Sequence, residues 1–210
     1  MALSLGMDSA FLISAFVTMF VVIDPPGLAP LFLVLTRDMD AAQRRSIGLR
    51  ACLVAIGVLA VFAAFGEAVM GFVGISMPAF RVAGGILLFL TALDMLFERR
   101  TKRRKDQTDE HPEDPSVFPL AVPLIAGPGA IASIILLAGQ KPGWEGFFLS
   151  VLVTAAVIAV AMIFLMLSGV VERVLGKTGI NVVTRLLGML LAALSVQFVL
   201  DGLRAFGFAS

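Results

Sequence analysis

Long runs of apolar residues separated by short polar stretches dominate the sequence. Six such runs cover residues 10–36, 47–67, 77–97, 117–139, 147–170 and 182–203. A helix that crosses a bilayer needs about 20 mainly apolar residues, and every run reaches that length. The connections are short except for 98–116, so almost no chain is left for a soluble domain. The pattern predicts an all-α polytopic membrane protein with six transmembrane helices.

Two of these runs contain residues that cannot continue a regular helix. Asp24-Pro25-Pro26-Gly27 interrupts the first run, and Gly127-Pro128-Gly129 interrupts the fourth. Proline lacks a backbone donor and clashes with the preceding turn, and glycine loosens the chain. Inside a membrane, the backbone groups freed in this way need protein, trapped water or a ligand as partners. We therefore predict that spans 1 and 4 are broken near the midplane, as in transporters whose binding site lies between two broken helices.

The two halves of the chain repeat one another. Pro26-Gly27 matches Pro128-Gly129, and further matches follow in the same order: Glu67 with Glu172, Gly71 with Gly176, Gly74 with Gly179, Arg81 with Arg185, Gly84 with Gly188, and Thr91 with Ser195. Such a collinear series is typical of internal repetition. Each half holds three spans, an odd number, so the second half must be inverted relative to the first. We predict a three-helix membrane repeat over 1–97, a charged cytoplasmic linker over 98–116, and a second, inverted three-helix repeat over 117–210.

Composition agrees with a membrane protein, and the distribution of charge predicts its orientation. Hydrophobic residues make up 59% of the chain, the mean hydropathy is +1.00, and the formal net charge is only +1. Lys and Arg gather in the connections between spans 1 and 2, 3 and 4, and 5 and 6. Cytoplasmic loops carry the excess of positive charge. We therefore expect these connections in the cytoplasm, both termini outside, and Trp144 at the outer interface.

Asp24 is the outstanding candidate for a site. A carboxylate near the bilayer centre is costly and marks a functional position by default. Asp followed by Pro is also typical of a helix N-cap with proline in the first turn. Asp24 therefore either caps the half-helix behind it or holds a cation, which would be a proton, Na⁺ or an ammonium group. The two roles are compatible, because a carboxylate has more lone pairs than one cap uses.

The corresponding residue in the second repeat is Ala126, so the second break has no acidic cap. The N–H groups and the positive dipole end of a half-helix that starts there favour an anion such as a carboxylate. An acid beside an uncapped helix start suits a zwitterion with ammonium and carboxylate one carbon apart. The candidate substrate- or ion-binding residues of the two breaks are Asp24, Pro25, Pro26, Gly27, Gly127, Pro128, Gly129 and Ala130.

Two further repeat-matched pairs complete the candidate site. Arg81 and Arg185 lie about one turn inside spans 3 and 6. They either anchor these helices at the interface or pair with a substrate carboxylate or with the repeat-matched glutamates. Thr91 and Ser195 lie deeper in the same spans, and they either hydrogen-bond across helices or face the site.

Enzyme signatures are missing from the sequence. It has no His-Glu-x-x-His, Gly-x-Ser-x-Gly or phosphate-loop motif and no cluster of Cys and His. The single cysteine, Cys52, suits a packing role inside span 2, and the single histidine, His111, lies in the linker, which has the composition of a solvated tether. We therefore expect no enzyme, no cofactor, no metal site and no nucleic-acid partner. Transport would draw on an H⁺ or Na⁺ gradient or on diffusion.

The sequence resembles the MarC family of bacterial inner-membrane proteins, which includes the SnatA-like small neutral amino acid transporters. Three segments carry the resemblance: Asp24-Pro25-Pro26-Gly27-x-x-Pro30-x-Phe32, Phe80-Arg81-x-Ala83-Gly84-Gly85, and Ala121-x-Pro123-Leu124-x-Ala126-Gly127-Pro128-Gly129-Ala130. The resemblance covers essentially the whole chain. It implies six spans in the bacterial inner membrane, a distant relationship to the LysE-type exporters, and transport of glycine- or alanine-like substrates.

Together these features predict a secondary transporter for small neutral amino acids, coupled to a cation. Its partners would be a small-molecule substrate and the lipid bilayer, and small-residue helix faces are compatible with a homo-oligomer. Rival interpretations are an exporter of another small solute or drug, a channel, and a non-transporting membrane scaffold or assembly protein in which the breaks only permit close packing.

Overall fold

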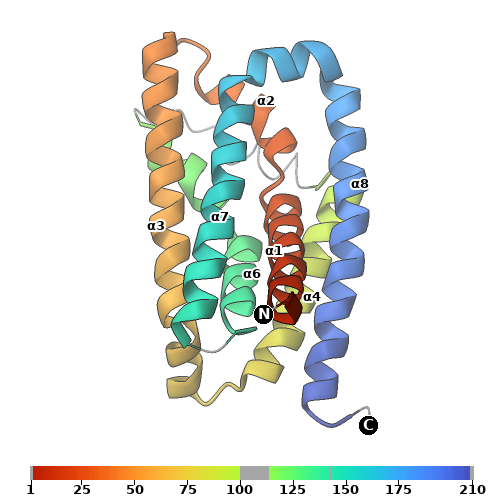
Figure 1. Cartoon of the computed structure of the whole chain (residues 1–210). Coiled ribbons are helices and arrows are strands. Elements are labelled where there is room, and N and C mark those ends of the chain that lie inside the picture. The colour runs from red at the N-terminus through yellow and green to blue at the C-terminus, as the bar shows by residue number, and fades with distance from the viewer. Residues whose placement is uncertain (1, 100–113, 142, 209–210) are drawn as a thin grey trace.

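A computed structural model describes residues 2–99, 114–141 and 143–208 (Figure 1). These residues form helices without a β-strand: α1 (Ala2–Ile23), α2 (Pro25–Leu35), α3 (Ala41–Val73), α4 (Met77–Leu96), η1 (Ser116–Ile125), α6 (Pro128–Ala138), α7 (Gly143–Met166) and α8 (Ser168–Ala205). Five segments are long and apolar enough to cross a membrane, the first of which, Ser9–Leu35, runs through α1 and α2; the bent pair η1 and α6 makes a sixth if it counts as one span. The all-α, multi-span prediction is therefore confirmed. His111 and most of the predicted linker lie outside the described residues.

Local sequence explains where the membrane helices begin and end. The Asp40 carboxylate accepts from the backbone N–H of Gln43 at 2.8 Å, and the Gln43 side chain accepts from the Asp40 N–H at 3.0 Å, so α3 starts with a capping box. Ser76 caps α4 in a similar way, by accepting from the Ala79 N–H at 3.3 Å. Gly74, with φ +83°, ends α3 in a left-handed conformation that only glycine adopts readily.

Helices α4 and α8 pack side by side in opposite directions (Figure 1). A Cβ on Gly85 of α4 would lie 2.8 Å from the carbonyl oxygen of Ser195 in α8, and a Cβ on Gly202 of α8 would lie 3.0 Å from the carbonyl oxygen of Pro78 in α4. Without side chains at these two glycines the backbones approach closely, as at many helix interfaces in membranes.

Helix contacts in one half of the chain have counterparts in the other. Helix α1 contacts α7, as η1 contacts α3; α2 contacts α8, as α6 contacts α4; and α2 contacts α7, as α6 contacts α3. The remaining large contacts, α3 with α7 and α4 with α8, join elements that occupy the same place in each half.

The end of the chain differs from the sequence prediction of two separate spans over 147–170 and 182–203. Helix α7 ends at Met166, and α8 begins at Ser168 after one intervening residue. Gly176, with φ +60° and ψ 177°, then kinks α8. The first part of α8 lies across the end of the bundle before the chain turns to run along it (Figure 1). The predicted connection is therefore largely helical.

The segment before the second break is irregular rather than a simple half-helix. Phe118 and Val122 in η1 have extended backbone angles, and each precedes a proline, which disfavours the helical conformation. At its start, the Asp114 carboxylate accepts from the Ser116 N–H at 3.0 Å and pairs with Arg50 of α3. The hydrogen bonds from Ser116 and the Arg50 charge lower the pKa of Asp114. This network connects the start of the second half to α3.

Candidate functional site

Asp24 separates α1 from α2 and is almost fully buried, with 1% of its surface exposed. Its backbone is left-handed, with φ 57° and ψ 63°, and its Oδ1 accepts from the Gly27 N–H at 3.2 Å. The predicted capping role of Asp24, with proline in the first turn of α2, is confirmed. A Cβ on Gly27 would lie 2.2 Å from the carboxylate oxygen Oδ2. A side chain at position 27 would therefore displace the Asp24 carboxylate from its capping position.

A residue that sequence reasoning missed also contacts the Asp24 carboxylate. The hydroxyl of Thr184 in α8 donates to Oδ1 at 3.3 Å and to Oδ2 at 3.5 Å. Thr184 is 6% exposed and lies 160 residues away along the chain. This hydrogen bond joins the break in the first half to the last helix of the second half.

A pocket opens beside this hydrogen-bonded pair, between α2 and α8. Its volume is about 270 Å³, and both Gly27 and Thr184 line it. The other lining residues of α2 are apolar, whereas α8 contributes the polar side chains of Glu172, Lys177 and Asn181. Pockets for drug-sized ligands start at about 300 Å³. The pocket is therefore suited to a small ligand with at least one polar or charged group.

The second break lies close to the first. Gly127 precedes α6 and provides no side-chain cap, as predicted from the missing acid. A Cβ on Gly129 would lie 3.2 Å from a methyl carbon of Val22 in α1 and 3.5 Å from the Thr91 hydroxyl oxygen in α4. The start of α6 is thus packed against the residues just before Asp24, and Ala130 is buried in the same turn.

Three buried hydroxyl groups in α1, α6 and α7 form no hydrogen bond with the described residues, and none belongs to a predicted site residue. They belong to Thr18 of α1, Ser133 of α6 and Thr154 of α7. Helices α1 and α6 contact one another and run in opposite directions (Figure 1), with Val22 against Gly129 near the breaks and Lys141 over the Phe11 ring at the far end. This register places Thr18 and Ser133 at the same level, one turn from the Val22 contact.

The remaining predicted site residues are distributed over α4 and α8. Arg185, next to Thr184, donates to Glu98 at 2.6 Å, and neither predicted glutamate is its partner. Arg81 lies near the start of α4, whose Met77 packs against Gly139 just beyond the end of α6, so the structure does not bring it to Asp24. Its Nε is buried without a hydrogen-bond partner among the described residues.

The matched hydroxyl residues of these helices bond locally. Thr91 donates to the Leu87 carbonyl at 3.0 Å, and the buried Ser195 donates to the Ala192 carbonyl at 2.7 Å. Each hydroxyl therefore bonds the backbone of its own helix. Thr91 also faces Gly129, whereas the Ser195 backbone packs against α4.

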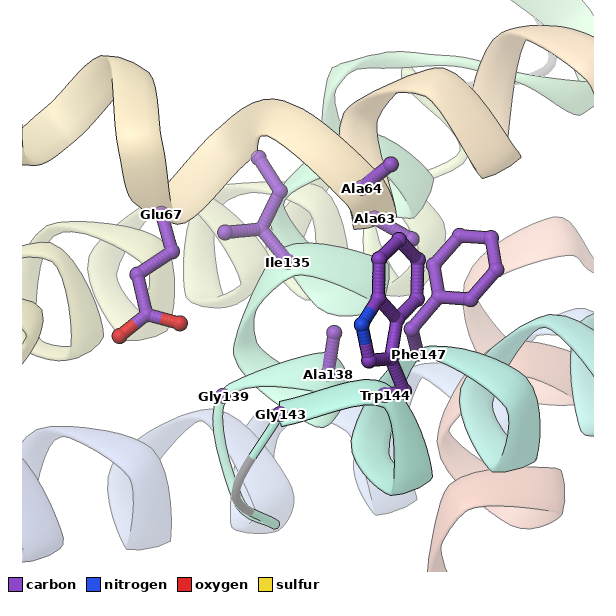
Figure 2. A pocket seen from close by; sticks show the side chains of 9 residues that line it. All are labelled: Ala63, Ala64, Glu67, Ile135, Ala138, Gly139, Gly143, Trp144 and Phe147. Carbon is purple, nitrogen blue, oxygen red and sulfur yellow. The ribbon is translucent and has the colours of Figure 1, made fainter.

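A second pocket, of about 200 Å³, lies where α6 joins α7, at the opposite end of the bundle from the kink in α8. Figure 2 shows Glu67 of α3 at one edge of this pocket and the rings of Trp144 and Phe147 of α7 at the other. Glu67 and Glu172, which match in the two repeats, thus line different pockets. The residues that the structure describes contain no group of three or more acidic, His or Cys side chains suited to a metal ion.

These features define a multi-pass helical membrane protein with a buried acid between α1 and the short helix α2. A family profile described as "MarC family integral membrane protein" matches residues 9–206. The chain belongs to this family.

Relatives in distant organisms match over almost the whole chain. It is 36% identical to the UPF0056 membrane protein YvbG of Bacillus subtilis, over 93% of this chain and 95% of that protein. It is 40% identical to a UPF0056 membrane protein of Methanocaldococcus jannaschii, over 92% of this chain and 86% of the relative. A UPF0056 membrane protein of Aquifex aeolicus is 36% identical, over 91% of this chain and 92% of its own length. No solved structure shows significant similarity to the chain.

Proposed function

We propose that this protein is a secondary transporter that moves small neutral amino acids, such as glycine and alanine, across the bacterial inner membrane together with a cation, H⁺ or Na⁺. The observation that carries the proposal is the buried Asp24, whose carboxylate accepts a hydrogen bond from Thr184, a residue that lines a pocket of about 270 Å³. Burying an ionisable group inside a membrane protein is costly and marks a functional position by default. A carboxylate beside a small pocket with polar groups in one wall suits an ammonium group or a coupling cation.

The paired helix contacts support an inverted 3+3 repeat. Exchanging the halves reproduces three pairs of contacts, those of α1 with α7, α2 with α8 and α2 with α7, and α4 and α8, the last helices of each half, run in opposite directions. In this arrangement α1 with α2, and η1 with α6, are the two broken spans of a midplane site. The basic connections then face the cytoplasm and both termini face outward.

Charge at the two breaks supports a zwitterionic substrate. Asp24 would receive the ammonium group or the coupling cation, and the uncapped start of α6 at Gly127 offers backbone N–H groups and a positive dipole end to a carboxylate. Lys177 and Asn181 in the pocket wall are further partners for a carboxylate on its way in. The Glu67 pocket at the other end of the bundle would be the second point of access when one repeat rocks against the other.

The rival interpretations fit these features less well. A pocket of about 270 Å³ is small for a drug. A scaffold would need the break capped, but it would gain nothing from a buried carboxylate that Ser or Asn could replace. A channel would show conductance but no saturable, gradient-driven accumulation of substrate.

Uptake into proteoliposomes tests the proposal. Radiolabelled glycine and alanine would be supplied under an imposed H⁺ or Na⁺ gradient to wild type and to Asp24→Asn, which keeps a capping side chain but removes the charge. We expect saturable, gradient-driven accumulation in wild type and its loss in the variant. Accumulation that survives in Asp24→Asn would return this residue to a purely capping role. No flux of either amino acid under any gradient would overturn the assigned substrate class.

A further inference from the structure

A larger cavity, of about 560 Å³, lies at the end of the bundle where α2 leads into α3 and α7 leads into α8. Phe32, Leu165 and Met166 form part of its apolar wall. Among the described residues, its charged lining side chains are Arg44 of α3 and Arg173 of α8, and none of them is acidic. It is distinct from the pocket beside Asp24, because the two share no lining residue.

The two arginines are presented to this cavity in different ways. Arg44 is fixed by its own protein contacts: Nε donates to the Thr36 carbonyl at 3.1 Å and Nη2 donates to the Arg37 carbonyl at 3.3 Å. Arg173 is exposed and forms no hydrogen bond or ion pair with the described part of the chain. The first turn of α8 contains no acidic residue. Two guanidinium groups therefore share one cavity without a compensating carboxylate from the described part of the chain, and an anion bound there would offset their repulsion.

The chemistry of these groups favours phosphate. Guanidinium presents a planar set of donors that matches phosphate oxygens, and such charge-assisted hydrogen bonds are stronger than neutral ones. An arginine already oriented by Thr36 and Arg37 loses less conformational freedom on binding than a free side chain does. A phosphate group is accordingly the expected ligand for the polar part of the cavity.

The surroundings favour a phosphate that is attached to an apolar chain. The first part of α8 lies across the end of the bundle (Figure 1), and it exposes Val170 and Val174, with 53% and 75% of their surfaces accessible. An amphipathic segment of this kind lies in the membrane interface, with apolar side chains toward the acyl chains and cationic ones toward the headgroups. The basic connections at this end predict the cytoplasmic leaflet, where anionic lipids are found.

We infer that the cavity between Arg44 and Arg173 binds the phosphate headgroup of an anionic phospholipid, with an acyl chain along the apolar wall. The site fixes the junction of α7 and α8 against the start of α3. Lipid binding there depends on the orientation given by the basic connections but not on the transported substrate. It can therefore be tested separately from transport.

The test uses the purified full-length protein in a neutral detergent. Thermal unfolding would be followed by the fluorescence of Trp144, the single tryptophan. Phosphatidylglycerol, phosphatidylcholine and inorganic phosphate at matched ionic strength would be added to wild type, Arg173→Gln and Arg45→Gln. Arg173 is the variant of choice, because Arg44 also holds the backbone before α3. Arg45 is the matched control, since it is an exposed neighbour that does not line the cavity.

We expect phosphatidylglycerol to raise the melting temperature of wild type and Arg45→Gln at similar lipid concentrations. Arg173→Gln should need a roughly tenfold higher lipid concentration for the same rise, because it lacks about one charge-assisted interaction. Phosphatidylcholine and inorganic phosphate should give little stabilisation. Equal stabilisation of Arg173→Gln and wild type by phosphatidylglycerol would overturn the site. Equal stabilisation by inorganic phosphate would overturn the lipid as its ligand. The lipid result and the uptake result are independent: lipid-dependent stabilisation can hold in a protein that does not take up amino acids, and uptake can occur without it.

Discussion

Replacing Thr184 by Val should destabilise the protein through the buried Asp24 carboxylate. The substitution keeps the side-chain shape and removes only the hydroxyl that donates to Asp24 at 3.3 and 3.5 Å. A hydrogen bond to a charged group contributes roughly 1.5–3 kcal/mol, but these distances exceed the usual 2.7–2.8 Å for O–H···O bonds, so we expect a value at or below the lower end of that range. We expect a loss of roughly 1–1.5 kcal/mol, which corresponds to a fall in melting temperature of roughly 2–6 °C for a chain of this size.

The assay is thermal unfolding in detergent together with amino acid uptake. Thr184→Ser, which keeps the hydroxyl, should stay close to wild type in both measurements. Thr178→Val is the matched control, because it makes the same change on an exposed part of the same helix. If Thr184→Val and Thr184→Ser melted at the same temperature as wild type, the hydroxyl would not hold the carboxylate and the reasoning would be refuted.

Three further changes test the packing, the acid network and the buried hydroxyls. Gly85→Ala should lower the free energy of unfolding by about 1–3 kcal/mol, because its Cβ would meet the α8 backbone. Gly57→Ala is the control and should be neutral or stabilising, since a Cβ there has open space. Equal shifts of the melting temperature in the two variants would contradict the close packing of α4 on α8. Because the pKa of Asp114 is lowered in the folded protein, its carboxylate stabilises the fold above the unfolded pKa of 3.8, and this stabilisation is lost as the pH falls through the folded pKa. The melting temperature of Asp114→Asn should therefore vary less with pH than that of wild type below about pH 4. Identical pH profiles of the two melting temperatures would argue against this role of Asp114. Thr154→Val removes a hydroxyl that has no hydrogen-bond partner among the described residues, so the melting temperature should stay that of wild type. Reduced uptake at unchanged stability would place that hydroxyl in the transport path. A lower melting temperature would contradict its unbonded state.

The features that the sequence predicts well are those set by neighbours along the chain. The apolar runs give the helices, and Asp24 followed by two prolines gives the start of α2, because the cap joins residues three apart. The missing cap at Gly127 is equally local. Thr184 could not be found in this way, since its contact with Asp24 depends on how α8 packs against α2, and a single Thr in a mostly apolar helix carries no signal of its partner.

The internal repeat predicts which residues correspond but not their conformation. Gly71 matches Gly176 and Gly74 matches Gly179, yet the two of these four glycines with a positive φ are Gly74 in the first half and Gly176 in the second. The helix is therefore interrupted three residues earlier in the second half relative to the aligned sequence. Glycine permits a left-handed backbone without requiring it, and the surrounding packing decides which one adopts it.

Direct binding of alanine to the purified protein tests the central claim most directly. Radiolabelled alanine would be titrated against wild type and Asp24→Asn in detergent, without any gradient or vesicle, with Asp38→Asn as the control for loss of one negative charge elsewhere. We predict saturable binding to wild type and to the control, and its loss in Asp24→Asn. Binding of equal affinity in all three proteins would contradict a substrate site built on the buried carboxylate.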